Sequence, residues 1–485
     1  MTVLGAISLM LFLCALIAAL RGWIPQRVLT LQSVLVLVAL AIISLRVIVG
    51  PPILWAQIFT ATSLHPITST IAGFLFAGAL QAAGGFQAAA SLVGRVTHTP
   101  LGLPFAIVLL VNFPTIFAMP CGRILAAPLM PLALVLGFEI ARLHQDKTMA
   151  AMVVFGFLVN AGASCAPSLI GGLGLLGEGM GRFPMGSFSK PNQMAILAIT
   201  VATMAMIRLH YGSTLSMRAE EAPAGPSRPV PESGYLSFIL FIAVLIAIVA
   251  VRLPIPIQTI LTLMTVVVMF VARLSFRDLL GGIMLHPLSA LVAGYVVAGA
   301  LLTAGGFEVL QAVLVLLAEH TVLGYIGVSI LVVFLPLFLA MPCGRIISVS
   351  LIPGVLMFGG RVAEASGFAL APAVLLASFV LSSAASCGPS PLGGVGNIGE
   401  GRLRIPGFWS SRPQALGIFL GVPLAALLVP LHGIQPPASD PGFALTMLLI
   451  GATAGVLTNI LFGYRPHHIG GVIGGLLVGG LMVML

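Results

Sequence analysis

Two arginines lie inside long apolar runs, each directly after a break in the pattern. Arg123 follows Pro120-Cys121-Gly122, and Arg345 follows Pro342-Cys343-Gly344. A guanidinium at membrane depth is costly and usually serves a function. If a helix begins at each glycine, its free N–H groups and positive dipole end add to the arginine charge. The pattern therefore predicts an anion-binding site built from Cys121, Gly122, Arg123, Cys343, Gly344 and Arg345. The alternative is an arginine that reaches the membrane surface and only fixes topology.

A second candidate site lies downstream of each arginine, in segments 164–174 and 386–396. Proline and closely spaced glycines unwind a membrane helix, which leaves hydroxyls and carbonyls free to bind a substrate or Na⁺. The predicted substrate ligands are the serines Ser164, Ser168, Ser386 and Ser390. The predicted ion-coupling positions are Gly171, Gly172, Gly174, Gly393, Gly394, Gly396 and Asn160. The alternative is a packing kink whose polar groups are satisfied by a neighbouring helix.

Two glutamates between glycines also recur, Glu178 and Glu400, each with an arginine four residues later. That spacing is typical of a local ion pair near the membrane edge. The alternative is a glutamate that carries the coupling proton, which requires the ion pair to loosen in one transport state.

The five cysteines offer a metal site as a further alternative. Cys14 stands alone, whereas the other four lie at the predicted helix breaks and could bind Cu(I) or Zn²⁺. No Cys-x-x-Cys or Cys/His spacing supports such a site, and a cysteine is small enough to fit a tight break. We therefore expect no metal and no cofactor.

Composition predicts an all-helical integral membrane protein. Hydrophobic residues make up 59% of the 485 positions and charged residues only 7%, against about a quarter in soluble domains. The apolar runs are too unbroken for barrel strands. The net charge of +9 comes mostly from span ends, which favours cytoplasmic positive loops over nucleic acid. We expect a multi-pass protein of the bacterial inner (plasma) membrane, with Met1 to Leu20 as a first span rather than a signal peptide.

The chain repeats itself. Ala118 to Arg123 returns as Ala340 to Arg345 at an offset of 222 positions, and Leu64-His65-Pro66 returns as Leu285-His286-Pro287. Whole elements therefore recur rather than one motif. We predict a first membrane repeat at 1–209, a polar linker at 210–233, a second repeat at 234–433 and an appended helical pair at 434–485.

Each repeat has the same predicted order of elements. In the first they are spans at 3–20 and 28–49, a span opening at Pro66, an amphipathic arm at 86–95, hairpin legs at 101–118 and 124–140, a broken span from 149 and a closing span at 191–208. The hairpin is re-entrant or crosses the membrane twice, so it adds an even number of crossings in either case. With five single spans, the first repeat then has an odd number of crossings, which places the second repeat in inverted orientation. One misjudged span would make the repeats parallel.

The appended pair is predicted at 443–462 and 469–485. In its second helix, glycines recur at helical spacing and form small-residue faces: Gly470, Gly471, Gly474, Gly475 and Gly479. Such faces allow close helix packing. They predict either a homodimer or packing against the parent bundle.

The pattern resembles the ion-transporter superfamily of organic-anion carriers, nearest to gluconate permeases. The likeness rests on Ala-Gly-Gly-Phe at 83–86 and 304–307, the Met-Pro-x-Gly tips at 119–122 and 341–344, and the breaks at Ser164 and Ser386. It implies two inverted repeats, each with a re-entrant hairpin and an unwound helix, that meet around one substrate near the midplane.

These observations predict a secondary active transporter of a small organic anion, with a carboxylate as the favoured solute, coupled to H⁺ or Na⁺ in a lipid bilayer. A channel or passive exporter of anions is the first alternative. A membrane-embedded enzyme is the second alternative, although the polar residues within the predicted spans include no evident catalytic base. The sequence has no nucleotide-binding motif that would use ATP directly.

Overall fold

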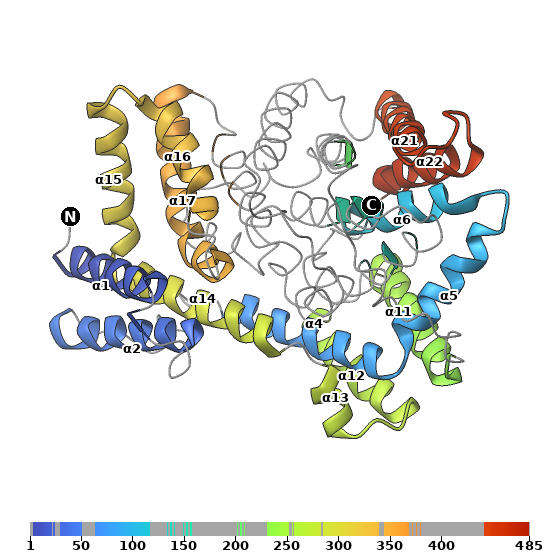
Figure 1. Ribbon diagram of the computed structural model, residues 1–485, viewed down its shortest axis with the longest axis horizontal. Coiled ribbons are helices and arrows are strands. Elements are labelled where there is room, and N and C mark those ends of the chain that lie inside the picture. The colour runs from blue at the N-terminus through green and yellow to red at the C-terminus, as the bar shows by residue number, and fades with distance from the viewer. Residues whose placement is uncertain are drawn as a thin grey trace. The chain divides into compact units, whose positions relative to one another are not determined.

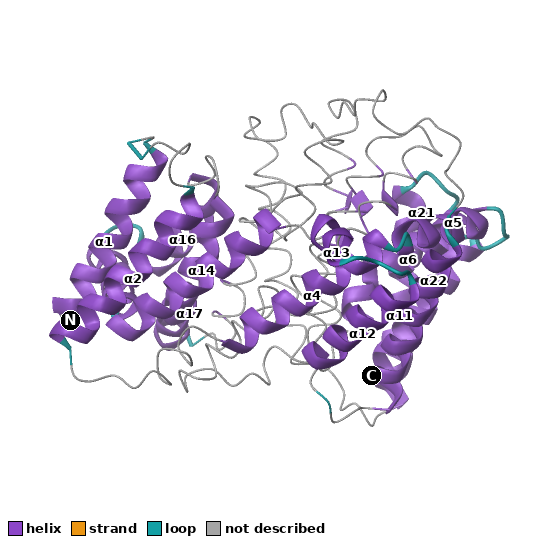
Figure 2. Cartoon of the chain, turned by 90° about the horizontal axis from the view of Figure 1, so that it is seen from below, coloured by secondary structure: helices purple, strands orange, loops and turns teal. Residues whose placement is uncertain are grey.

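The structure is a computed structural model, and every regular element among the residues that it describes is a helix (Figures 1 and 2). This confirms the all-helical class for the described part of the chain. The described residues are 3–21, 23–24, 30–50, 64–116, 230–251, 255, 257–282, 285–338, 344–367 and 441–484, with isolated positions within 133–157, 201–208 and 371–379.

The helices belong to two compact units, and each unit draws on both sequence halves. The first unit contains α1 (Val3–Leu20), α2 (Leu31–Val49), α14 (Leu285–Ala304), α15 (Gly306–His320), α16 (Gly324–Phe338) and α17 (Gly344–Ser366). The second contains most of α4 (Leu64–Ala82), with α5 (Gly85–Thr97), α6 (Gly102–Ile116), α11 (Glu232–Val251), α12 (Ile257–Val271), α13 (Phe276–Gly282), α21 (Pro441–Leu461) and α22 (Ile469–Met484).

Helix starts follow local capping rather than the first apolar residue. The span at 3–20 matches α1, but α2 begins at Leu31 instead of Val28. Thr30 is extended, and its hydroxyl accepts a hydrogen bond from the Ser33 backbone N–H at 3.3 Å, which is N-cap geometry. Pro66 lies inside the first turn of α4, where a missing N–H costs no helical hydrogen bond.

Two sharp bends occur at equivalent places in the halves. The axis turns by 69° between α4 and α5, and by 79° between α14 and α15. Gly84 and Gly305 form the corners, with φ of 83° and 78°. This left-handed backbone favours glycine because a Cβ would strain it. The predicted arms are therefore separate helices, and their location at a membrane interface stays a prediction.

The halves exchange their first helices. α1, from the first half, packs against α15 of the second, and α11, from the second half, packs against α5 of the first. In the second contact, the Tyr235 hydroxyl lies 3.0 Å from that of Ser91. The division at 1–209, 210–233, 234–433 and 434–485 stays a prediction about the sequence. The two compact units have other boundaries, because each combines segments from both halves.

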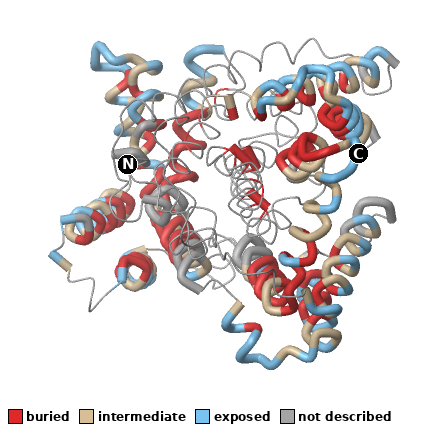
Figure 3. Tube along the Cα trace, turned by 45° about the vertical axis from the view of Figure 1, so that its right-hand side comes forward, coloured by how far each residue is buried: buried red, intermediate tan, exposed pale blue. Residues whose placement is uncertain are grey.

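Two to four of the described helices could span a membrane. Leu31–Val49 and Ala444–Leu461 are long and apolar enough on their own, and each bent pair adds one if it is a single broken span. The outer side of α2 is apolar, with Leu37 and Leu40 each 53% exposed; Figure 3 shows the exposed positions along the helices. An apolar exposed face is compatible with contact to lipid.

The predicted C-terminal pair is present as α21 and α22, which lie side by side (Figure 1). A Cβ at Gly475 would overlap the carbonyl of Gly451, and one at Gly471 would overlap the Asn459 side chain. On the neighbouring face, Gly474 lies against Phe105 and Val108 of α6. These glycine faces therefore pack within the chain, against α21 and α6, and a homodimer stays a prediction.

The short helix α13 begins with a reciprocal cap. The Ser275 hydroxyl and backbone N–H both donate to one Asp278 carboxylate oxygen, at 2.6 and 2.8 Å, and the Asp278 N–H donates back to the hydroxyl at 3.2 Å. This is capping-box geometry. The Ser275 hydrogen bonds, with a smaller contribution from Arg277, hold the pKa of Asp278 below its usual 3.8.

Replacing Ser275 by alanine is expected to raise the pKa of Asp278 towards 3.8. A depressed pKa stabilises the fold above the unfolded value, and this contribution is lost as pH falls through the folded pKa. Carboxyl ¹³C NMR of aspartate-labelled protein checks this, because the chain has only three aspartates. Arg277→Gln should produce a smaller rise, and an Asp278 pKa unchanged by Ser275→Ala would contradict the cap.

Candidate functional site

Most predicted site residues lie outside the described part of the chain. These are Cys121, Gly122, Arg123, Asn160, Ser164, Ser168, Gly171, Gly172, Gly174, Glu178, Cys343, Ser386, Ser390, Gly393, Gly394, Gly396 and Glu400. Gly344 and Arg345 lie inside it, at the start of α17. The candidate site is therefore built from this helix and its neighbours.

The helix α17 begins at Gly344, so Arg345 belongs to its first turn. The first backbone N–H groups of a helix have no partner within it, and that end carries partial positive charge. α17 also packs against α16, which is described up to Phe338. We call this packed pair of helices the α16–α17 hairpin; residues 339–343, which join the two helices in the sequence, lie outside the described residues.

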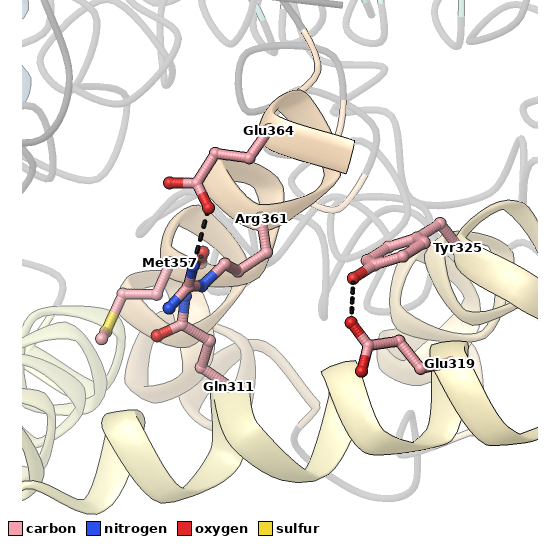
Figure 4. Close-up of polar contacts among 6 residues, drawn as sticks. All are labelled: Gln311, Glu319, Tyr325, Met357, Arg361 and Glu364. Carbon is pink, nitrogen blue, oxygen red and sulfur yellow. Dashed lines mark hydrogen bonds and ion pairs between the residues drawn. The ribbon is translucent and has the colours of Figure 1, made fainter. Parts of the chain in front are cut away.

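The arm α15 supports this hairpin by packing against both of its helices. Glycine at 354 lets α17 come close, since a Cβ there would lie 2.7 Å from Leu310 and 3.1 Å from Phe307. Gln311 is 8% exposed, and its amide donates to the Met357 carbonyl at 2.9 Å (Figure 4). A buried amide bonded to a backbone carbonyl fixes the register of the two helices.

The opposite end of the hairpin is polar and exposed. Tyr325 donates to Glu319 at 3.0 Å, and Arg361 pairs with Glu364 at 2.7 Å (Figure 4). The arginine and glutamate side chains are 51% and 67% exposed, so their pairing adds little stability. Arg361 follows Arg345 by sixteen residues, or about 24 Å along a helix. α17 therefore carries one arginine near each end.

The equivalent leg in the first half is α6, which precedes Arg123. Its Asn112 is buried, and the side-chain amide donates to the Val108 carbonyl at 2.9 Å. Gly102 begins α6 with φ of 63°, and Gly324 begins α16 with φ of 59°. The two legs thus start with the same backbone conformation at an offset of 222 positions.

Sequence reasoning missed a pair of buried serines. Ser8 in α1 and Ser237 in α11 are both fully buried, and within the described ranges neither hydroxyl has a hydrogen-bond partner. They belong to a motif that recurs at an offset of 229, in which a glycine precedes the serine by three residues and a phenylalanine follows by four. Comparing the first helices of the two halves would have found it.

Sequence reasoning also did not predict a specific contact for Arg46, a basic residue near the end of a span. Its Nε donates to the Thr303 carbonyl at 3.3 Å, across 257 positions of sequence. The acceptor lies in the last turn of α14, just before the second bend. A backbone carbonyl has no sequence signature, so no pattern could have indicated this contact.

The described residues contain no group of three or more His, Cys, Asp or Glu side chains that could hold a metal ion. Cys14, the one cysteine within these ranges, is exposed. A scan against protein-family models finds no match for the chain, and no curated protein sequence matches it. The likeness to organic-anion carriers therefore rests on the motifs in the sequence.

Proposed function

We propose that the chain is a secondary active transporter of a small organic anion, with a carboxylate as the favoured class, driven by H⁺ or Na⁺. The anion would bind at the arginine-bearing segments of the two repeats and be carried between the two sides of a multi-pass, inner-membrane bundle. Gradient coupling would come from the unwound segments after Ser164 and Ser386, or from Glu178 and Glu400.

The observation that supports this proposal best is the start of α17. A helix that begins at Gly344 has its free N–H groups and its positive end at this first turn, and Arg345 adds a full charge there. A planar guanidinium suits a carboxylate because it can donate two parallel hydrogen bonds.

Two features of the fold suit alternating access. Each half has a bent pair of helices followed by a leg that leads to its arginine, and the bends are 69° and 79°. In the second half, α15 packs on both α16 and α17. Such a three-helix group can move as one body, which would carry the binding turn without changing its local geometry.

The test is uptake of ¹⁴C-labelled gluconate, succinate and citrate into proteoliposomes, with and without a Na⁺ or pH gradient. The proposal expects accumulation above the external concentration that collapses when an ionophore dissipates the gradient. Equilibration without accumulation would instead indicate a channel or passive exporter. Chemical conversion of a substrate in detergent, where no gradient exists, would indicate an enzyme.

A further inference from the structure

The last turn of α14 leaves backbone carbonyls without helical donors, because the chain turns by 79° at Gly305. Arg46, the basic residue in the last turn of α2, donates from Nε to one of them, the Thr303 carbonyl, at 3.3 Å. A cation at a helix C-terminus also counters the partial negative charge there. This contact joins the first half of the sequence to the corner of the second.

Room for this contact depends on a glycine. Gly50 ends α2, and its N–H donates to the Arg46 carbonyl at 3.0 Å. A Cβ at Gly50 would overlap the Arg46 guanidinium. The backbone there is extended, with φ of −90° and ψ of 172°, but the same Cβ would lie 2.6 Å from the Arg46 carbonyl oxygen. Alanine would therefore displace the guanidinium and also shift the end of α2.

The first bend receives a different, uncharged partner. There the Ser233 hydroxyl lies 3.5 Å from the Ala83 carbonyl, and Gly234 sits so close that a Cβ would lie 2.7 Å from the Gly84 oxygen. Each corner is thus met by a helix from the other half of the sequence. The chemistry differs, with an arginine at the second corner and a serine at the first.

We propose that Arg46 is a positioning residue, which holds the α14–α15 corner and thereby fixes the arm that carries the α16–α17 hairpin. The connection continues through Gln311, which bonds the Met357 carbonyl in α17, the helix that begins at Gly344. Arg46 thus steadies the binding turn through the arm without touching the solute. Only the effect on uptake rests on the proposed function; the effect on the corner does not.

The direct test is hydrogen exchange of the full-length protein in detergent micelles, followed in peptides that cover each corner. Arg46→Met is expected to speed exchange at residues 302–309 by about five- to thirty-fold, the range of a helix-terminus charge. Arg46→Lys should restore part of the protection, because it keeps the charge. Gly50→Ala should reproduce the loss although the arginine is still present.

Two internal controls separate positioning from general loosening. Peptides over residues 81–88 should be unchanged in every Arg46 variant, and Ser233→Ala should affect these peptides alone. Arg21→Gln, an exposed arginine just after α1, should change neither corner. Equal exchange at 302–309 in wild type and Arg46→Met, or equal loosening of both corners, would overturn the proposal.

A transport assay distinguishes an effect of Arg46 on the maximal uptake rate from an effect on KM. In proteoliposomes that accumulate a carboxylate, Arg46→Met should lower the maximal uptake rate at least fivefold, with Arg46→Lys intermediate and KM within about twofold of wild type. A KM effect as large as that of Arg345→Gln would overturn the positioning role. If the wild type accumulates no carboxylate, the proposed function fails, and hydrogen exchange still decides the role of Arg46.

Discussion

Arg345→Gln is expected to weaken carboxylate binding about 30- to 150-fold. Glutamine keeps a donor but loses the charge in the first turn of α17, and a charge-assisted hydrogen bond contributes about 2–3 kcal/mol. Isothermal calorimetry of the purified protein with the carboxylate that it transports measures the change. Arg123→Gln should have a similar effect, because the repeat places the same residue types around it.

The matched control is Arg361→Gln, on the same helix as Arg345. Its partner Glu364 is exposed, and such surface pairs contribute little, so affinity should stay within about twofold of wild type. Arg95→Gln, an exposed arginine at the end of α5, should be equally mild. Losses of similar size at all these arginines would indicate a general electrostatic or structural role instead of a binding site.

Gly475→Ala is expected to cost about 3 kcal/mol of the free energy of unfolding. A Cβ at Gly475 would overlap the Gly451 carbonyl in α21, so the two helices would have to separate, and overpacking of this kind costs about 1–3 kcal/mol or more. Separation would also disturb the contacts of Val478 with Val108 of α6 and Ala454 of α21. Reversible unfolding in mixed micelles measures the loss.

Gly480→Ala provides the control from the same helix. The nearest atom to a Cβ at Gly480 is a methyl of Leu448 at 3.8 Å, which is an ordinary van der Waals contact. Alanine there should be neutral or slightly stabilising, because it reduces the freedom of the unfolded chain. Equal destabilisation at both positions would show that the α21–α22 contact does not set the cost.

Helix positions were largely predictable, because long apolar runs bounded by glycine and proline carry a strong local signal. The run at 3–20 matches α1, and the glycine corners at 84 and 305 were readable as breaks. Starts were less predictable, because one extended residue such as Thr30 can move the first turn.

The partners of these helices could not be predicted. Helix periodicity shows which face is apolar, but not which distant helix covers it. No local sequence pattern therefore indicated that α1 packs against α15 and α11 against α5. The same limit applies to the glycine faces of α22, where the spacing predicted close packing but left open whether the partner was α21, α6 or a second chain.

The candidate site was predictable in its residue types and only partly in its geometry. The Gly-Arg pair at 344–345 suggested a helix start, and α17 begins at Gly344. The support from Gln311 and the capping contact of Arg46 could not be foreseen, because both donate to backbone carbonyls, which every residue type offers.

The most direct test of the central claim is alkylation of a single cysteine at the turn. In a variant that keeps only Cys343, two positions before Arg345, maleimide labelling is followed with and without the transported carboxylate at saturating concentration. The account predicts labelling slowed at least tenfold by the anion, and no such protection when Arg345→Gln is added. Labelling at the same rate with and without the anion would contradict an anion-binding site at this turn.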